Sequence, residues 1–98
     1  SIDYGGRYLS QLFKDFNGNR VLATAAYNAG PARIKRVLKE QAQDMPADIW
    51  IETLPYSETR QYVQRVLAYS VIYRHQLGQT DGNVLTDNEQ LITKADAG

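Results

Sequence analysis

Two short stretches of the chain carry side chains whose types and spacing could do chemistry. In the first, Tyr27 supplies a hydroxyl and Asn28 an amide at the end of a small-residue segment, just before Gly30 and Pro31. A Gly-Pro pair ends one helix and starts the next, so both polar side chains would lie on a rigid helix end. In the alternative interpretation, which the residue pattern alone favours, Tyr27 is a core aromatic residue with its hydroxyl bonded nearby and Asn28 only caps the helix.

The second stretch places Glu52 and Glu58 on either side of Pro55, with Arg60 close by. Paired carboxyl groups can divide the acid and base steps of glycoside cleavage. The alternative is structural, with Glu58 a favourable charge in the first turn of a helix and Arg60 its surface partner. The spacing alone favours the structural interpretation.

The other candidate groups are isolated in the sequence. Trp50 is the only tryptophan and could stack on a sugar ring or fill the core as an apolar plug, and the plug is favoured. His75 is the single histidine and is expected to be a surface residue or a hydrogen-bonded structural residue rather than a catalyst. With one histidine and no cysteine, the sequence predicts no metal site and no thiol nucleophile.

Composition limits the fold and the partners. The chain has 98 residues, with 11 Lys and Arg against 11 Asp and Glu. This length predicts one domain with a thin margin of stability. A net charge of zero argues against a nucleic-acid partner, because phosphate binding depends on clustered positive charge. The first residues include neither Met nor a basic leader, which suggests a mature or excised piece of a longer protein.

Four amphipathic helices are expected to position these groups. Apolar residues recur at three- and four-residue spacing, which predicts helices over residues 2–16, 20–28, 31–43 and 57–79. The buried stripe of the last helix is expected to comprise Tyr62, Val63, Val66, Leu67, Ser70, Tyr73 and Leu77.

The segments outside these helices are expected to be irregular. Asn19 and Ser57 are predicted to cap the second and fourth helices. Residues 44–57 contain two prolines and are expected to form a loop with at most one helical turn. Residues 80–98 are polar and are expected to form a flexible tail with at most one marginal helix. The predicted fold is therefore all-α, with four helices in residues 1–79, a loose C-terminal tail and almost no sheet.

In combination, the two stretches resemble the motifs of the soluble lytic murein transglycosylase family. The resemblance rests on Ala25-Ala26-Tyr27-Asn28-Ala29-Gly30-Pro31 and on Glu52-Thr53-Leu54-Pro55-Tyr56-Ser57-Glu58-Thr59-Arg60-Gln61-Tyr62-Val63. The opening Ile2-Asp3-Tyr4-Gly5-Gly6-Arg7-Tyr8-Leu9 is similar to the segment that precedes them in the family. The resemblance covers residues 1–78. It implies that residues 1–79 are the C-terminal part of a lysozyme-like, mostly helical catalytic domain.

The resemblance also implies a reaction. Enzymes of this family cleave the β-1,4 bond between N-acetylmuramic acid and N-acetylglucosamine in peptidoglycan. The C6 hydroxyl of the muramic acid attacks, which leaves a 1,6-anhydro end, and one Glu acts first as acid and then as base, without a cofactor. In the family this Glu lies upstream, in a Glu-Ser helix start followed by a Gly-Leu-Met-Gln stretch. Neither stretch occurs in this sequence, so the chain alone is expected to be inactive.

The resemblance implies that several residues of this chain line one wall of the substrate-binding cleft. Tyr27 matches the family's active-site tyrosine, and Glu58 matches its second active-site acid. The other matching positions, which could contact substrate or instead tie the Pro55 turn to the helix end, are Asn28, Glu52, Arg60 and Tyr62.

The implied partners are peptidoglycan glycan strands, in the periplasm or cell envelope of a bacterium. Without the upstream half, the apolar faces of the first two helices would be exposed, which predicts self-association or docking of that half. Two alternatives are a non-catalytic peptidoglycan-binding module and a purely structural helical domain with a chance match to the motifs.

Overall fold

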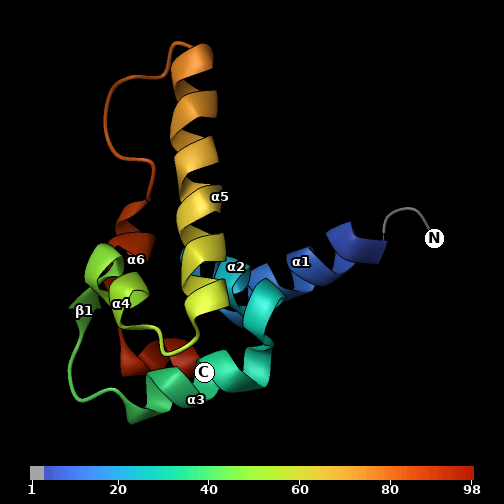
Figure 1. The fold of residues 1–98 in the computed structure, drawn as a ribbon, viewed down its shortest axis with the longest axis vertical. Coiled ribbons are helices and arrows are strands. Elements are labelled where there is room, and N and C mark those ends of the chain that lie inside the picture. Colours follow the sequence, from blue (N-terminus) through green and yellow to red (C-terminus); the bar gives the residue numbers. More distant parts are fainter. Residues whose placement is uncertain (1–3) are drawn as a thin grey trace.

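The Ala-rich helix α2 (Arg20–Ala29) lies at the centre of the fold and contacts α1 (Tyr4–Asp15), α3 (Pro31–Glu40) and α5 (Ser57–Gln76). The computed structural model describes residues 4–98 (Figure 1). These four helices are the ones that the apolar spacing predicts, and the all-α class is confirmed. The predicted start of the first helix at Ile2 lies outside the described residues.

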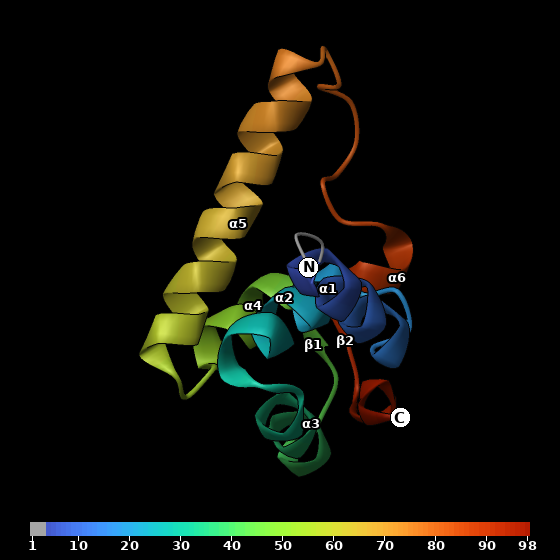
Figure 2. The ribbon, with the colours of Figure 1, turned by 90° about the vertical axis from the view of Figure 1, so that its right-hand side faces the viewer.

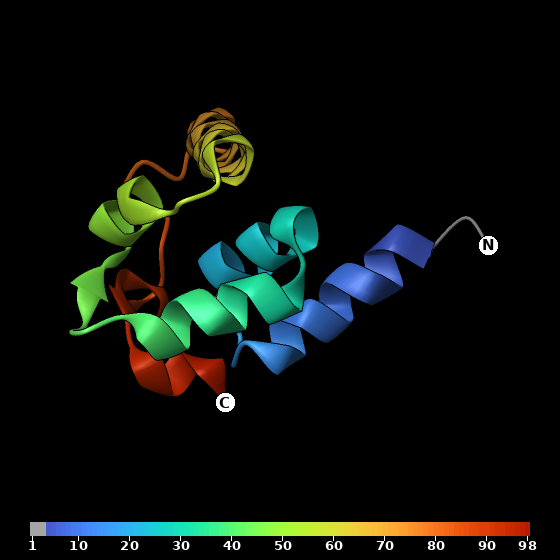
Figure 3. The same ribbon diagram turned by 60° about the horizontal axis from the view of Figure 1, so that its bottom comes forward.

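Helix α2 owes its limits and its central place to a few residues. The side chain of Asn19 accepts a hydrogen bond of 3.1 Å from the backbone N–H of Leu22, which confirms the predicted cap. Gly30 ends the helix with φ 98°, a left-handed conformation that favours glycine. Ala25 and Ala26 are fully buried, and such small side chains let three helices approach α2 closely (Figure 3).

The remaining elements are short. They are strand β1 (Met45–Pro46), helix α4 (Ala47–Thr53), helix α6 (Asp87–Gln90), strand β2 (Leu91–Ile92) and the 3₁₀ helix η1 (Lys94–Ala97). The two strands pair antiparallel and are the whole sheet of the described residues. The expectation of almost no sheet is therefore confirmed for the part of the chain that the structure describes.

The expected loop over residues 44–57 contains a two-turn helix, so that prediction is corrected. Trp50 is 1% exposed and Ile51 is 4% exposed, and both belong to the core. Pro46 directly precedes this helix, where a proline costs little because the first N–H groups have no helical partner. Burial of Trp50 also decides between its two roles, because a ring enclosed in the core cannot stack on a sugar.

The predicted cap at Ser57 is wrong. Helix α5 begins at Ser57, and the cap position before it is occupied by Tyr56 without a side-chain hydrogen bond. Glu58 lies in the first turn, as predicted, where its charge suits the helix dipole.

The buried stripe predicted for α5 is only partly correct. Val63 is fully buried and Leu67 is partly buried against the core. Tyr73 and Leu77, further along, are exposed, because the second half of α5 extends beyond the other helices (Figure 1). The stripe therefore continues past the end of the core that could cover it.

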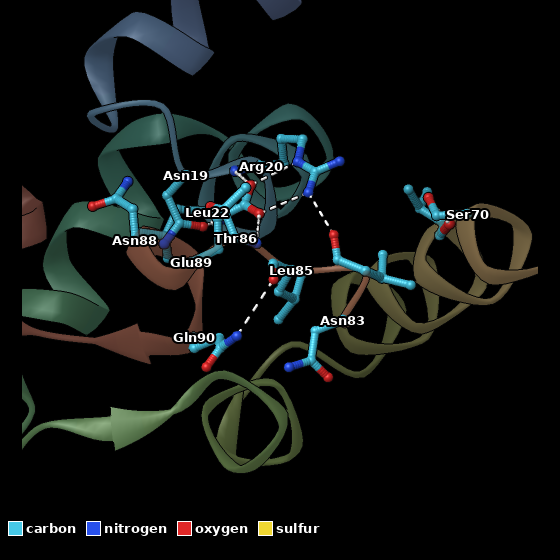
Figure 4. Close-up of polar contacts among 12 residues, drawn as sticks. Asn19, Arg20, Leu22, Ser70, Asn83, Leu85, Thr86, Asn88, Glu89 and Gln90 are labelled. Carbon is cyan, nitrogen blue, oxygen red and sulfur yellow. Dashed lines mark hydrogen bonds and ion pairs between the residues drawn. The ribbon is translucent and has the colours of Figure 1, made fainter. Parts of the chain in front are cut away.

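The prediction of a loose tail is wrong for the last residues of the chain. From the far end of α5 the chain returns to the body of the fold (Figure 2). Glu89 and Ile92 are fully buried there, and η1 packs against α3. Burial of Ile92 opposite Met45 and the bonding of the Glu89 carboxylate to Arg20 (Figure 4) supply the packing that a polar composition does not reveal. We call residues 84–97 the C-terminal strap.

No helix within residues 4–98 combines the length and the apolar character that crossing a membrane would require.

Candidate functional site

The end of α2 carries Tyr27 at an accessible position. The side chain is 42% exposed, so the interpretation of Tyr27 as a buried core residue is wrong. Its ring lies 5.9 Å from the ring of Tyr8 on α1, at an interplanar angle of 40°. A Cβ atom at Gly5 would lie 3.4 Å from the Tyr27 hydroxyl oxygen, so the first turn of α1 passes close to this hydroxyl. Two aromatic rings and a phenolic hydroxyl therefore lie together where α1 and α2 meet.

Asn28 links the end of α2 to the start of α5. Its Oδ1 accepts a hydrogen bond of 2.7 Å from the Thr59 hydroxyl, and its Nδ2 donates one of 3.4 Å to the Glu58 carboxylate. Thr59 is 2% exposed, whereas the Glu58 side chain is open to solvent. Asn28 does not cap α2, because the cap position is occupied by Gly30. The amide is thus fixed by a buried hydroxyl on one side and points its other end at an exposed acid.

Arg60 holds the turn between α4 and α5. Its guanidinium donates a hydrogen bond of 2.7 Å to the Leu54 carbonyl, directly before Pro55. Of the three roles considered for it, this hydrogen bond supports the tie between the turn and the helix. Tyr56, in the same turn, faces the Arg33 guanidinium at 5.6 Å from the ring centroid.

The two remaining predicted site residues are Tyr62 and Glu52. Tyr62 is half-buried on α5, and Glu52 is exposed on α4. No side-chain hydrogen bond of either residue is found in the part of the chain that the structure describes. The predicted pairing of Glu52 with Glu58 is thus without a shared contact, whereas Asn28 contacts Glu58 and follows Tyr27 directly at the end of α2.

This arrangement can bind a polar ligand with several hydroxyl or amide groups. The phenol of Tyr27 both donates and accepts hydrogen bonds, the amide of Asn28 does the same, and the carboxylate of Glu58 accepts them. All three project from helix ends fixed by core packing, which reduces the ordering needed on binding. His75 is exposed, as predicted, and within residues 4–98 no three His, Asp or Glu side chains gather as metal ligands would.

A second concave feature lies beside α2, along the face that carries Val21 and Thr24. It is a groove of about 490 Å³ between α1, α2, α5 and the beginning of the strap. Apolar side chains dominate its lining, among them Leu9, Phe13, Val66, Leu67 and Leu85. We call it the apolar groove. Its chemistry suits an apolar surface rather than a saccharide.

Sequence reasoning missed two members of the site. Thr59 lies within the second motif stretch, but only its burial and its hydrogen bond to Asn28 give it a role. Tyr8 lies in the opening segment of the resemblance without an assigned role, and its approach to Tyr27 depends on how α1 crosses α2. Neither contact leaves a signal in residue spacing.

The family comparison matches most of the chain in two parts. A family model described as "Transglycosylase SLT domain" matches residues 1–49. A second, described as "Soluble lytic transglycosylase helical domain", matches residues 53–81. The Tyr27–Asn28 pair lies in the first match, and Glu58, Arg60 and Tyr62 lie in the second.

Individual relatives agree with these family models. The chain is 43% identical over 89 residues to a soluble lytic murein transglycosylase of Salmonella typhimurium, which is 91% of this chain and 14% of the relative. It is 42% identical over 78 residues to the protein of that name in Escherichia coli K12, covering 80% of this chain and 12% of the relative. The chain therefore spans a small part of the length of these relatives.

Comparison with solved structures also finds a lytic transglycosylase. The chain is similar to an inactive Glu-to-Gln mutant of the lytic transglycosylase Slt from Pseudomonas aeruginosa, with a TM-score of 0.77 and 50% sequence identity. The match covers 88% of this chain and 14% of that one.

Proposed function

Because this chain belongs to the soluble lytic murein transglycosylase family, with its all-α, lysozyme-like fold, we propose that it forms one wall of a peptidoglycan-binding cleft. The proposal rests above all on one observation. Asn28 is fixed between the buried Thr59 and the exposed Glu58, next to the accessible Tyr27. In this assignment, the side chains that contact the glycan strand are Tyr27, Asn28, Glu58, Glu52 and Tyr62, while Arg60 holds the turn that presents them.

The reaction of the whole enzyme, in this proposal, is cleavage of the MurNAc–GlcNAc β-1,4 bond. A carboxyl group protonates the glycosidic oxygen as the C1–O bond breaks. The resulting carboxylate then takes the proton from the C6 hydroxyl as that oxygen bonds to C1, which gives a 1,6-anhydromuropeptide and requires no water. The substrate places the enzyme in the periplasm or cell envelope of a bacterium.

We assign the acid and base role to a Glu outside residues 1–98. General acids in glycosidases are carboxyl groups enclosed by apolar surroundings. Glu40, Glu52 and Glu58 are exposed, and Glu89 is buried in an ion pair with Arg20. In the fold that residues 4–98 form by themselves, none of the four glutamates is both enclosed and unpaired, so the chain alone is expected to bind without cleaving.

Binding is tested by NMR titration of the 98-residue chain with purified muropeptides. We expect shift changes at Tyr27, Asn28 and Glu58. Tyr27→Phe should weaken binding about fivefold, the value of one neutral hydrogen bond. Glu58→Gln should weaken it about tenfold, because its hydrogen bonds involve a charge.

Two control variants make the same chemical changes at positions outside the proposed site. Tyr69→Phe removes a hydroxyl from an exposed residue of α5, and Glu40→Gln removes a charge at the end of α3. Both should bind like the unmodified chain. Equal affinity for all four variants, or no shift change at Tyr27 and Glu58, would show that the proposed wall is wrong.

Catalysis is tested separately by mass spectrometry of peptidoglycan incubated with the chain. We expect no 1,6-anhydromuropeptides while circular dichroism shows a folded chain. Their appearance would show that a Glu of this chain does the chemistry, and Glu58→Gln would then identify or exclude the first candidate.

We also propose that the chain self-associates through the apolar groove. The second copy is the chosen occupant because the chain carries a matching surface. Exposed apolar side chains gather on the free end of α5, at Tyr69, Val71, Ile72, Tyr73 and Leu77. In a two-fold pair, the free end of each α5 would enter the groove of the other copy, and zero net charge offers no overall repulsion.

Sedimentation equilibrium across a wide range of concentrations tests this association. Leu9→Glu places a charge in the groove and should abolish the pair. Gln64→Glu places the same charge on an exposed part of α5 outside the groove and should leave it intact. A strictly monomeric chain, or equal effects of the two variants, would contradict the proposal.

A further inference from the structure

One face of α1 leads from the core to the candidate site. Leu12, Tyr8 and Gly5 follow one another at spacings of four and three residues, so they lie on the same side of this helix. Leu12 is 1% exposed and belongs to the core, whereas Tyr8 is 40% exposed and its ring lies beside that of Tyr27. The face therefore leaves the core at Tyr8, where α1 extends away from the other helices (Figure 3).

At Gly5 this face of α1 carries no side chain. A Cβ atom there would lie 3.4 Å from the Tyr27 hydroxyl oxygen, which is an ordinary contact distance. Apart from the helix itself, that oxygen is the one heavy atom of the described residues within 4 Å of the position. An alanine would therefore fit in the folded chain, and its methyl group would touch the hydroxyl.

Neither the backbone nor close packing requires a glycine at this position. Gly5 lies within a helix without a positive φ, and it is exposed. Alanine favours a helix more than glycine does, because glycine loses more conformational freedom on folding. The chain thus gives up helix stability here and keeps room beside the Tyr27 hydroxyl.

The phenol and the two rings next to this room are open to a ligand. Tyr27 is 42% exposed, and no hydrogen bond of its hydroxyl is found within residues 4–98. The ring planes of Tyr8 and Tyr27 meet at 40° with their centroids 5.9 Å apart, so the rings form a shallow corner. Tyrosine rings offer apolar area at a low cost in conformational entropy, and the C–H face of a pyranose ring is a matching surface.

We propose that the beginning of α1 forms a further side of the glycan site. Tyr8 and Tyr27 pack together against the C–H face of one sugar ring. Gly5 leaves the room through which a hydroxyl or acetamido substituent of that ring reaches the Tyr27 hydroxyl. The inference rests on the proposed function, because it extends the wall that Tyr27, Asn28 and Glu58 make, and it assigns Gly5 a role in deciding which substituents can approach.

Muropeptide titration of Gly5→Ala tests the room beside the hydroxyl. We expect binding to weaken about fivefold, as for Tyr27→Phe, because each change removes one neutral hydrogen bond. In a chain that already carries Tyr27→Phe, Gly5→Ala should cause no further loss, since the hydroxyl that the methyl group shields is gone. The urea midpoint of Gly5→Ala should stay the same or rise. A glycine needed only for the fold would instead lower the midpoint.

Gly6→Ala is the matched control for this variant. It makes the same change one residue later, at a position that lines the apolar groove. It should move the urea midpoint in the same direction and leave binding to dilute chain unchanged. The geometry is checked without ligand by an NOE, in Gly5→Ala, between the new methyl group and the ring protons of Tyr27.

The ring of Tyr8 is tested by two substitutions. Tyr8→Ala should weaken muropeptide binding about threefold to tenfold, the value of one aromatic contact. Tyr8→Phe keeps the ring and should bind like the unmodified chain. Equal binding by Tyr8→Ala and the unmodified chain would overturn the role of the ring.

Several results would overturn the role of Gly5. These are unchanged binding by Gly5→Ala, an equal loss in Gly6→Ala, a further loss on top of Tyr27→Phe, a lowered urea midpoint of Gly5→Ala, or the absence of the NOE. If Tyr27→Phe and Glu58→Gln weaken binding while the α1 variants do not, this inference alone has failed and the proposed function stands. If the unmodified chain shows no shift changes with muropeptides, both have failed.

Discussion

The strap and the free end of α5 are neighbours in the sequence and opposites in the structure. The stripe predicted for α5 continues through Tyr73 and Leu77, yet both side chains are exposed, as are the other large apolar side chains of residues 69–77. Residues 84–97 are largely polar, yet they contain two fully buried side chains and an ion pair. The free end of α5 therefore has the composition of a core segment but is exposed to solvent. The strap has the composition of a flexible tail but is packed against the fold.

The difference shows what an apolar pattern can and cannot predict. A pattern fixes the conformation of a segment and the side that it would bury, but burial also requires a facing surface. The free end of α5 lacks one within residues 4–98 (Figure 1). The strap meets β1, α3 and the first turn of α2, and there one isoleucine and one carboxylate are enough to hold it.

The largest effect is expected from Ile92→Ala, which empties a fully buried site under the strap. The free energy of unfolding should fall by about 2–4 kcal/mol, through lost burial and a residual cavity. Leu91→Ala is the control, because Leu91 precedes it on β2 and is exposed on the other face. Urea denaturation of both variants measures the difference, and equal costs would show that the strap does not pack in solution.

The second-largest effect is expected from low pH, which should destabilise the packing of the strap. Burial alone would raise the pKa of Glu89, but the hydrogen bonds that it accepts from Arg20 and from backbone N–H groups outweigh burial, and the folded-state pKa is lowered from 4.5 to about 2. Its contribution is therefore fully present above about pH 4.5 and is lost as the pH falls toward 2, a change of roughly 2–3 kcal/mol. We expect urea midpoints to fall over this window in the unmodified chain, and by less in Glu89→Gln, which has no carboxylate to protonate. Parallel profiles would contradict the assignment.

A smaller effect is expected at the packed beginning of α5. Thr59→Val keeps the shape of a side chain that is 2% exposed but removes its hydrogen bond to Asn28. The cost should be about 1 kcal/mol, because Asn28 is half-buried and its freed oxygen can bond to water. Thr80→Val in the exposed linker should cost nothing measurable. Muropeptide binding should weaken in Thr59→Val alone, since Asn28 loses the contact that fixes it.

The helices could be predicted because their signals are local. Asn19, Gly30 and Pro31 mark the limits of α2 and α3 in the sequence, and the structure places them as predicted. The helix at residues 47–53 was missed because the prolines flanking it were read as breakers, although Pro46 only precedes its first turn. The strap was missed because its stability comes from Arg20 and Met45, which lie far away in the sequence.

The candidate site was predictable only through its motifs. The resemblance singled out Tyr27, Asn28 and Glu58, and the structure joins Asn28 to Glu58 and leaves the neighbouring Tyr27 accessible. Spacing alone had favoured a structural interpretation of both stretches, because it does not show that α2 ends beside the start of α5. For the same reason Tyr8 and Thr59 could not be foreseen.

The smallest effect is expected from Ile72→Ala, the same chemical change as Ile92→Ala on the free end of α5. Ile72 is 53% exposed, so little burial is lost, and the better helix propensity of alanine offsets part of it. The free energy of unfolding of dilute chain should change by less than about 0.5 kcal/mol. A cost near that of Ile92→Ala would mean that something covers this end in solution. If that cost grows with protein concentration, the cover is a second copy, as the self-association requires. If it does not, α5 packs within its own chain and the contrast between the two segments is lost.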